Sequence, residues 1–495
     1  MPLPESDTVT TRPKAGRKKW NPGFRLVRGP GCGWATGLVR PFEIVLSLSC
    51  LPALFPALFG IRPPRFLEGV VLFAPAILLG LHAVMEGPRL HLAPLYLVAV
   101  LSGCVGVGKI FASGPWLPVW AGGICAFCGL MLAGGGFLSG WVFPVFSLPD
   151  PAGPYRIGTV TFPLGGELGG REVAVQLWYP AKAGVSGRHA SYLPEGERAP
   201  SRIFSNLEKV RTHAFEGAEA AEVKGGWPVI LSSHSWDGRR FENSALCEAL
   251  ASEGFVVAAI DHPRDGDTPP LDFSTAESAE RFQLAASREL EARVSDVLQV
   301  FAALPKLQAG LLAGGLFKNK LDPITVGAFG YSFGGAVAAE ACLREPRLLA
   351  GANLDGALFG PAAREGAAQP FLFVTDSAPP PPESELHSTD PAVRRNAEFS
   401  AASLRDMDRW LETRGGWLVR MDGVRHANFC DRPLYSRLER YTGAGRRNAV
   451  ATLNEVDAFV VAFFNETLRG QQAALLEKNS SPWPGVEIRR FPPPR

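Results

Sequence analysis

The chain has 495 residues, of which 46% are hydrophobic, and a formal net charge of only +2. A chain of this length exceeds the size at which one hydrophobic core stops growing, so two or more structural units are expected. The small net charge, without a basic run in the second half, argues against nucleic acid as a partner. Apolar runs crowd into the first third and charges follow Asp150, which indicates a membrane part followed by a soluble part.

The first 40 residues form a basic arm, with eight Lys or Arg and no acid between residues 12 and 40. Apolar runs without Asp, Glu, Lys or Arg follow at residues 44–61, 69–85, 90–108 and 110–149. Each is near or above the ~20 residues that a spanning helix needs, so about four transmembrane helices are predicted over residues 41–149. The last run is long enough to contain a re-entrant or fifth segment around residues 134–136.

The basic arm and the number of helices together predict on which side of the membrane the C-terminal part lies. A basic arm held in the cytosol and an even number of helices return the C-terminal part to the cytosol. The cysteines after residue 150, Cys247, Cys342 and Cys430, are too scattered for a disulfide framework, which also favours the cytosol. Cys125 and Cys128 have CxxC spacing inside an apolar run, and we interpret them as helix packing residues. The protein is thus predicted to be a multi-pass integral membrane protein with a cytosolic C-terminal domain.

From residue 150 to about 470 strand and helix patterns alternate, as a mostly parallel α/β sheet requires. Helical patterns cover residues 277–304 and 334–343, and a charged segment ending near Gly415 is expected to form a cap or excursion helix. Residues 471–495 are interpreted as a Pro-rich tail. Strands are expected at residues 171–179, 227–232, 255–260, 324–329, 348–354, 370–375 and 417–421.

A GxSxG motif centred on Ser332 carries the chemical signal. The apolar strand 324–329 precedes it and a helix rich in small residues follows, which is the strand, sharp turn and helix order of a nucleophile elbow. The flanking glycines permit the close backbone approach that such a turn needs. This context predicts an α/β-hydrolase fold with Ser332 as the nucleophile.

A nucleophilic serine needs a histidine base and an acid that orients it, and in this fold they follow the serine in the order acid, then histidine. Downstream of Ser332 lie His387, in a polar Pro-rich excursion, and His426, after the last predicted strand. His426 is therefore the predicted base. Asp355 and Asp376 both end strands at the carboxyl edge of the sheet, and sequence order leaves both open as the acid.

From about residue 154 to 464 the chain resembles the platelet-activating factor acetylhydrolase family, plasma and intracellular type II, and its bacterial relatives. The matching stretches, in family order, are VAVQLWYP, SHSWDGRR, EGFVVAAIDHPRDGD, GYSFGG, ANLDG and RHANF. The resemblance implies Ser332 as nucleophile, Asp355 as acid and His426 as base. It also implies an oxyanion hole formed by the backbone N–H groups of Trp236 and Phe333, although the family's HG pair reads His234 and Ser235 here.

The resemblance implies a membrane-anchored serine esterase that cleaves the sn-2 acetyl, short or oxidised acyl ester of phospholipids. A general carboxylesterase, or a catalytically silent membrane scaffold, are the alternatives. No cofactor or metal is expected: Asp261, His262 and Asp265 are interpreted as a structural or substrate-entrance loop, because no further ligands have matching spacing. The expected partners are the ester or phospholipid substrate and the bilayer, and the sequence leaves the oligomeric state open.

Overall fold

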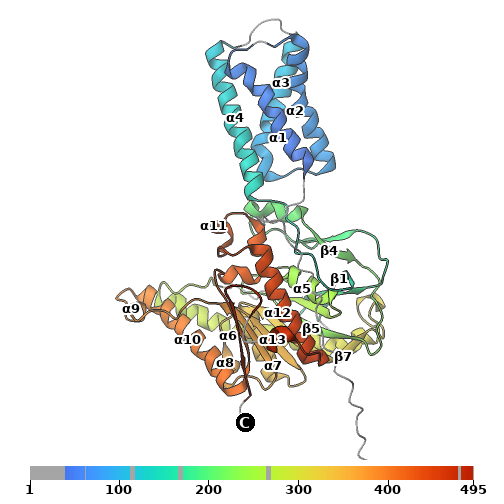
Figure 1. Cartoon of the computed structure of the whole chain (residues 1–495), viewed down its shortest axis with the longest axis vertical. Helices are drawn as coiled ribbons and strands as arrows, with labels where there is room; N and C mark the ends of the chain where they lie inside the picture. The colour runs from blue at the N-terminus through green and yellow to red at the C-terminus, as the bar shows by residue number, and fades with distance from the viewer. Residues whose placement is uncertain are drawn as a thin grey trace, which may run out of the picture.

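The computed structural model describes residues 40–61, 63–111, 117–165, 171–263, 269–477 and 481–493. A bundle of long helices stands on one end of an α/β domain (Figure 1). The basic arm, apart from Arg40, and Asp265 lie outside the described residues.

Four long helices form the bundle, with the short helix η1 (Leu90–Leu92) before the third. They are α1 (Pro41–Leu58), α2 (Arg65–Met85), α3 (Ala93–Phe111) and α4 (Val119–Val142). Their outer surface is apolar: Phe66, Val84 and Phe111 are each at least 84% exposed. A helix bundle whose outer surface is as apolar as its interior matches a lipid environment better than water.

Small residues let the helices of the bundle approach closely. A side chain at Gly136 would meet the backbone nitrogen of Leu95 at 2.9 Å, and one at Gly103 would meet the Cβ of Ala76 at 3.0 Å. Such small-residue contacts are typical of helix packing in membranes. Helix α4 continues through residues 134–136, so the described part of the last apolar run contains one helix and neither a re-entrant turn nor a fifth segment.

Within the described residues, five helices are long and apolar enough to cross a membrane by length and composition. Four are those of the bundle. The fifth lies within residues 276–315, where α6 (Ala276–Gln308) buries Val294, Val297 and Val300 in the core of the α/β domain. We therefore assign α6 to the α/β domain.

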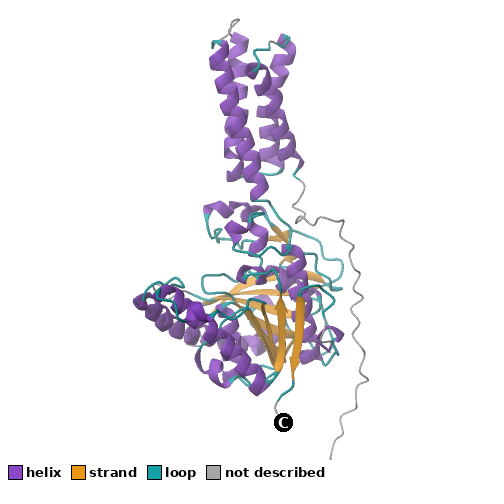
Figure 2. Ribbon diagram, turned by 60° about the vertical axis from the view of Figure 1, so that its left-hand side comes forward, coloured by secondary structure: helices purple, strands orange, loops and turns teal. Residues whose placement is uncertain are grey.

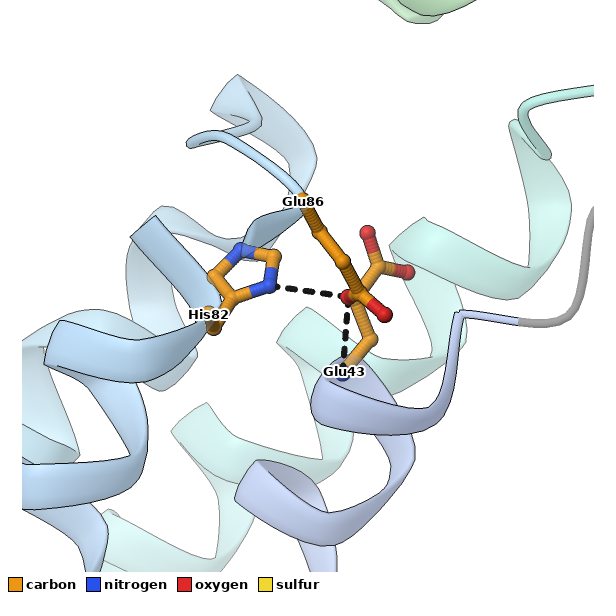
Figure 3. Close-up of side chains that lie close together, drawn as sticks. All are labelled: Glu43, His82 and Glu86. Carbon is orange, nitrogen blue, oxygen red and sulfur yellow. Dashed lines mark hydrogen bonds and ion pairs between the residues drawn. The ribbon is translucent and has the colours of Figure 1, made fainter. Parts of the chain in front are cut away.

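One cluster of charged groups lies at the end of the bundle nearest the α/β domain, while Glu68 and Lys109 form a separate pair at 2.7 Å. The Glu86 carboxylate accepts the backbone N–H groups of Phe42 and Glu43 at 3.1 Å each, and so caps the start of α1. Figure 3 shows Glu86 close to Glu43 and to His82, whose Nδ1 lies 3.1 Å from a Glu86 oxygen. Arg89 also pairs with Glu43 at 2.7 Å. Ion pairs therefore explain why Glu43, His82 and Glu86 lie close together.

The α/β domain is built on one sheet in the order β11-β10-β9-β8-β7-β5-β6-β2-β1-β4-β3. The six strands from β10 to β6 are mutually parallel, while β2 and β11 run antiparallel to their inner neighbours. The strands are β1 (Arg156–Leu164), β2 (Val173–Ala181), β3 (His189–Ser191), β4 (Arg211–Glu216), β5 (Trp227–Ser233), β6 (Val256–Asp261), β7 (Leu321–Tyr331), β8 (Ala350–Leu354), β9 (Phe371–Asp376), β10 (Gly416–Met421) and β11 (Val486–Phe491).

Helices cover both faces of the sheet (Figure 2). One core cluster contains residues of α6, α7 (Phe333–Arg344), α8 (Gly360–Glu365) and α10 (Pro391–Arg414), and the other contains residues of α5 (Ser244–Ser252), α12 (Ala449–Arg469) and α13 (Ala474–Glu477). The short helices are η2 (Arg202–Lys209), η3 (Ala313–Gly315), α9 (Glu383–Leu386), η4 (His426–Phe429), η5 (Arg432–Tyr435) and α11 (Glu439–Thr442).

The structure has a strand at each of the seven expected positions and a mixed sheet with flanking helices. Its edges differ from the expectation. Strands β1, β3 and β4 were not predicted, and the expected tail at 471–495 instead contains α13 and β11, which pairs with β10 from Gly416 to Met421. At the other end, Phe143 and Phe146 are already buried in the α/β domain. The domain therefore extends beyond both predicted limits, 150 and 470.

Ile488 of β11 is 1% exposed and packs in the core shared with β10 and α12, whereas its neighbour Arg489 is exposed. We expect Ile488→Ala to lower the free energy of unfolding by about 2–4 kcal/mol through the lost burial and the cavity left behind. Arg489→Ala is the matched control and should change it by less than about 0.5 kcal/mol. Denaturant unfolding of the α/β domain measures both, and equal stabilities would mean that β11 does not belong to the domain.

Candidate active site

Ser332 lies at the sharp turn between β7 and α7. Its backbone φ and ψ are 56° and −124°, a conformation that non-glycine residues rarely adopt. The turn requires its glycines, because a Cβ at Gly330 would lie 2.0 Å from the carbonyl oxygen of Gly334, and one at Gly334 would lie 2.0 Å from that of Ser233. The predicted elbow is present, and it presents the hydroxyl at the carboxyl edge of the sheet.

The three predicted site residues meet at this edge. The Nε2 atom of His426, at the start of η4, lies 2.8 Å from the Oγ of Ser332. The other ring nitrogen, Nδ1, lies 2.7 Å from the carboxylate of Asp355, which follows β8. The second oxygen of Asp355 accepts the hydroxyl of Thr375 at 2.7 Å and the backbone N–H of Asp376 at 3.2 Å. Asp355 is thus fixed on one side and free to orient His426 on the other.

In the described structure neither competing residue hydrogen-bonds to Ser332 or His426, although Asp376 lines the same cavity. The carboxylate of Asp376 accepts the backbone N–H of Ala378 at 3.1 Å, and none of its hydrogen bonds in the described structure reaches His426. His387 is exposed at the end of α9, where its Nδ1 lies 3.0 Å from the carbonyl oxygen of Glu383.

The charge environment of His426 favours the protonated ring. Burial by itself would lower the pKa of His426, but the hydrogen bond and negative charge of Asp355, followed by the charges of Glu242 and Asp376, raise it above its usual value. A raised pKa makes this imidazole a stronger proton acceptor. Burial raises the pKa of Asp376, and the nearby charge of Asp355 raises it further.

The loop after β5 brings Trp236 beside Phe333, with ring centroids 4.8 Å apart. Arg293 of α6 donates to the carbonyl oxygens of Ser235 and Trp236 at 3.0 and 2.9 Å. Because a trans peptide is planar, the N–H of Trp236 points away from the Ser235 carbonyl and hence away from Arg293. Glu242 holds the same loop from inside by accepting both the backbone N–H and the hydroxyl of Ser235.

A second chain of Ser, His and Asp side chains lies buried below this loop. Sequence analysis missed it and interpreted Asp261, His262 and Asp265 only as a structural or substrate-entrance loop. The Oγ of Ser233 is 2.8 Å from Nε2 of His262, and Nδ1 of that ring is 2.9 Å from Asp296. All three side chains are at most 3% exposed. The backbone N–H of His262 donates to Nε2 of His234 at 3.1 Å. This buried chain therefore joins β6 and α6 to the loop that contains Trp236.

A cavity of about 590 Å³ opens over Ser332 and His426. It is a mostly apolar site with a few polar groups, and its volume lies in the range typical of small-molecule sites. Helix α10 was expected as a cap or excursion helix. Its middle lines the cavity through Phe399 and Leu404, and its C-terminal part packs Trp410 on Phe371 of the sheet.

A family model described as platelet-activating factor acetylhydrolase, isoform II, matches residues 142–378, just under half of the chain. The match includes Ser332 and Asp355 and ends before His426. A platelet-activating factor acetylhydrolase of Gallus gallus is 20% identical over 277 residues, which cover 46% of this chain and 65% of the relative. One of Cavia porcellus is 26% identical over 269 residues, which cover 46% of this chain and 60% of the relative.

A probable 1-alkyl-2-acetylglycerophosphocholine esterase of Arthroderma benhamiae is 27% identical over 158 residues, covering 30% of this chain and 37% of the relative. The chain thus spans between about a third and two thirds of the length of these curated relatives. A solved structure of a ferulic acid esterase from Streptomyces cinnamoneus is 26% identical, with a TM-score of 0.51 over 69% of this chain and 98% of that chain. The sequence matches and the fold agree: the α/β domain is similar to the platelet-activating factor acetylhydrolase family and to an esterase of the α/β-hydrolase superfamily.

Proposed function

We propose that the protein is a serine ester hydrolase with Ser332 as nucleophile, His426 as general base and acid, and Asp355 as the orienting acid. The observation that carries the proposal is the unbroken hydrogen-bonded chain from Ser332 through His426 to Asp355 at the floor of the cavity. The same chain argues against a catalytically silent scaffold, because a scaffold gains nothing from a serine in a strained elbow facing a histidine.

In the first step His426 accepts the Ser332 proton while Oγ attacks the ester carbonyl carbon, and Asp355 stabilises the imidazolium that forms. The proton then passes to the departing alcohol as the carbon–oxygen bond breaks, which leaves an acyl group on Ser332. Water, deprotonated by His426, attacks that acyl group and releases the acid and the free serine.

The backbone N–H groups of Trp236 and Phe333 are the proposed donors to the negative oxygen that develops during both steps. Support comes from the adjacent positions of the two residues on the cavity wall, and from the Ser235 carbonyl held by Arg293, which turns the Trp236 N–H to the opposite side. Arg293 and Glu242 hold the loop from two sides, so the donor is positioned before the substrate binds.

The proposed substrates are phospholipids with an sn-2 acetyl, short or oxidised acyl chain, because the named relatives are platelet-activating factor acetylhydrolases and an alkylacetylglycerophosphocholine esterase. A general carboxylesterase is the second candidate. The solved structure that the chain resembles favours it, since that protein is a ferulic acid esterase.

We propose further that the bundle anchors the protein in a membrane with the catalytic domain in the cytosol. The exposed apolar surface of α1 to α4 and the small-residue contacts between them support insertion. The basic arm before α1 supports a cytosolic N-terminus, and four spans return the chain to the same side.

The assignment of the acid can be tested with two conservative variants. Asp355→Asn keeps the shape but removes the charge that orients His426, so turnover of an activated ester should fall by about 10⁴-fold, as in a comparable triad. Asp376→Asn should change turnover by less than about threefold, and Ser332→Ala should abolish both turnover and fluorophosphonate labelling. All variants are compared at matched thermal melts. A crippled Asp376→Asn beside a near-normal Asp355→Asn would reverse the assignment.

The burial of Glu242 predicts a pH-dependent stability. Burial raises its pKa from 4.5 to about 7, so the folded state holds the proton more tightly than the unfolded chain. The resulting stabilisation is fully present below about pH 4.5 and is lost as the pH rises through about 7, by at most about 3 kcal/mol. Glu242→Gln mimics the protonated acid and can keep both contacts to Ser235. Relative to this variant, the wild type should lose stability between about pH 4.5 and pH 7. Parallel melting curves across that range would contradict the prediction.

Membrane insertion and topology are tested in cells that express the full chain. The protein should stay in the pellet when isolated membranes are washed with alkaline carbonate. Protease added to sealed, right-side-out cells should leave residues 150–470 intact, and the same protease should digest them after permeabilisation. Release by carbonate would exclude insertion of the bundle, and cleavage in sealed cells would put the catalytic domain outside.

A further inference from the structure

The cavity over Ser332 has two chemically different sides. In the proposed mechanism His426 passes its proton to the departing alcohol, so the alcohol part of the ester must lie beside His426. The carbonyl oxygen faces the N–H groups of Trp236 and Phe333. The acyl group must then extend toward the remaining wall, so each part of an ester can be matched with the residues that it would meet.

The acyl side is a connected group of aromatic rings. The ring of Trp236 lies 5.1 Å from that of Phe282 and 4.8 Å from that of Phe333, between ring centroids. Phe359 lies 5.4 Å from Phe333 and 6.2 Å from Phe399. All five residues line the cavity. Aromatic pairs at these separations are favourable, and the cavity volume far exceeds the space that an acetyl group fills.

The alcohol side carries negative charge. Asp376 and Glu385 line the cavity together with Asp355, and the charge of Asp376 acts on His426. Among the described lining residues there is no Lys or Arg. Arg395, on α10, donates to the backbone carbonyl of Phe273 at 2.8 Å and is not a lining residue.

An anionic group on the alcohol part would thus approach two carboxylates without a described Lys or Arg side chain to neutralise it. Like charges in a partly desolvated pocket repel, and the repulsion falls on the bound state and the transition state alike. A cationic or neutral alcohol part avoids this cost.

We infer that the cavity selects carboxylic esters with a bulky apolar acyl group, aromatic rings included, and an alcohol part without net negative charge. The inference rests on the proposed function and directs it toward the carboxylesterase alternative. The two sides of the cavity determine two separate preferences. The aromatic wall selects the acid part of the ester, and the carboxylates select the alcohol part.

The preference for an alcohol part without net negative charge is tested with three benzoate esters whose alcohol parts have similar shapes. They are benzoylcholine, its neutral isostere 3,3-dimethylbutyl benzoate, and the anionic 2-sulfoethyl benzoate. We expect kcat/KM for the anionic ester to be at least tenfold below that of the neutral one. Glu385→Gln should narrow this gap at least threefold, and Glu385→Lys should narrow it further. Added salt should also narrow the gap in the wild type, because rim charges are screened.

Glu383→Gln is the matched control, since Glu383 is an exposed acid on the same short helix and does not line the cavity. It should leave the gap unchanged. Equal rates on the three esters, or a faster rate on the anionic one, would overturn the proposed preference for an alcohol part without negative charge. If Glu383→Gln narrows the difference in kcat/KM as much as Glu385→Gln does, the effect comes from the net charge of the protein. That result would overturn the role of the cavity wall.

The preference for a bulky apolar acyl group is tested by comparing benzoylcholine with acetylcholine, which share one alcohol part. Phe399→Ala should lower kcat/KM for the benzoyl ester about tenfold and that for the acetyl ester less than threefold. Phe399→Leu, which keeps an apolar side chain, serves if the alanine variant fails to fold, and should lower the ratio of the two rates in the same direction. An unchanged ratio would overturn the role of the aromatic wall.

The outcomes separate the two levels of the argument. A folded protein that hydrolyses none of these esters and does not react with a fluorophosphonate probe would overturn the proposed function. A protein whose Ser332 is labelled, and which hydrolyses the esters without preference for charge or acyl size, keeps the proposed function and loses only this inference.

Discussion

The close approach of two backbones at Ser332 is the constraint on which the rest of the site depends. Strand β7 passes into α7 with so little space that neither Gly330 nor Gly334 could carry a side chain. Ser332 is therefore held at a positive φ, which costs conformational energy that the surrounding sheet must supply. Asp355 also has a positive φ of 56°, directly after the adjacent strand β8. The two reactive groups thus leave neighbouring strands at sharp turns and point to the same edge.

What the sequence could predict is the part of the site that local pattern encodes. A strand, a GxSxG turn and a helix are adjacent in the chain, so Ser332 could be found from one short window. The choice of His426 followed from chain order and the small number of histidines. The acid was harder, because Asp355 and Asp376 both end strands, and only the resemblance chose between them. In the structure His426 Nδ1 lies at hydrogen-bond distance from the carboxylate of Asp355 and not from that of Asp376.

Other features depend on long-range packing and left no local signal. Strand β11 reads VEIRRF, in which apolar and charged residues alternate over only four positions, and it pairs along its length with β10. The chain of Ser233, His262 and Asp296 joins three segments that only the folded sheet brings together. A rule based on metal-ligand spacing can reject a metal site at His262, but it cannot identify the ring as a buried hydrogen-bonding link.

The bundle and the α/β domain are joined by more than a linker. The backbone carbonyl of Val142, at the end of α4, accepts the N–H of Arg437 at 2.8 Å and the hydroxyl of Ser436 at 3.0 Å. His91 reaches the carbonyl oxygen of Ile203 in η2 at 2.8 Å, and Asn206 donates to that of Pro144 at 2.7 Å. Figure 1 shows α9 and α10, which contribute to the cavity wall, at the side of the domain and not beneath the bundle. Because these contacts fix the junction, a bundle held in a bilayer would keep the cavity at the side of the α/β domain, in water. A substrate would have to leave the lipid phase to reach Ser332, which favours esters with appreciable solubility in water over long-chain lipids.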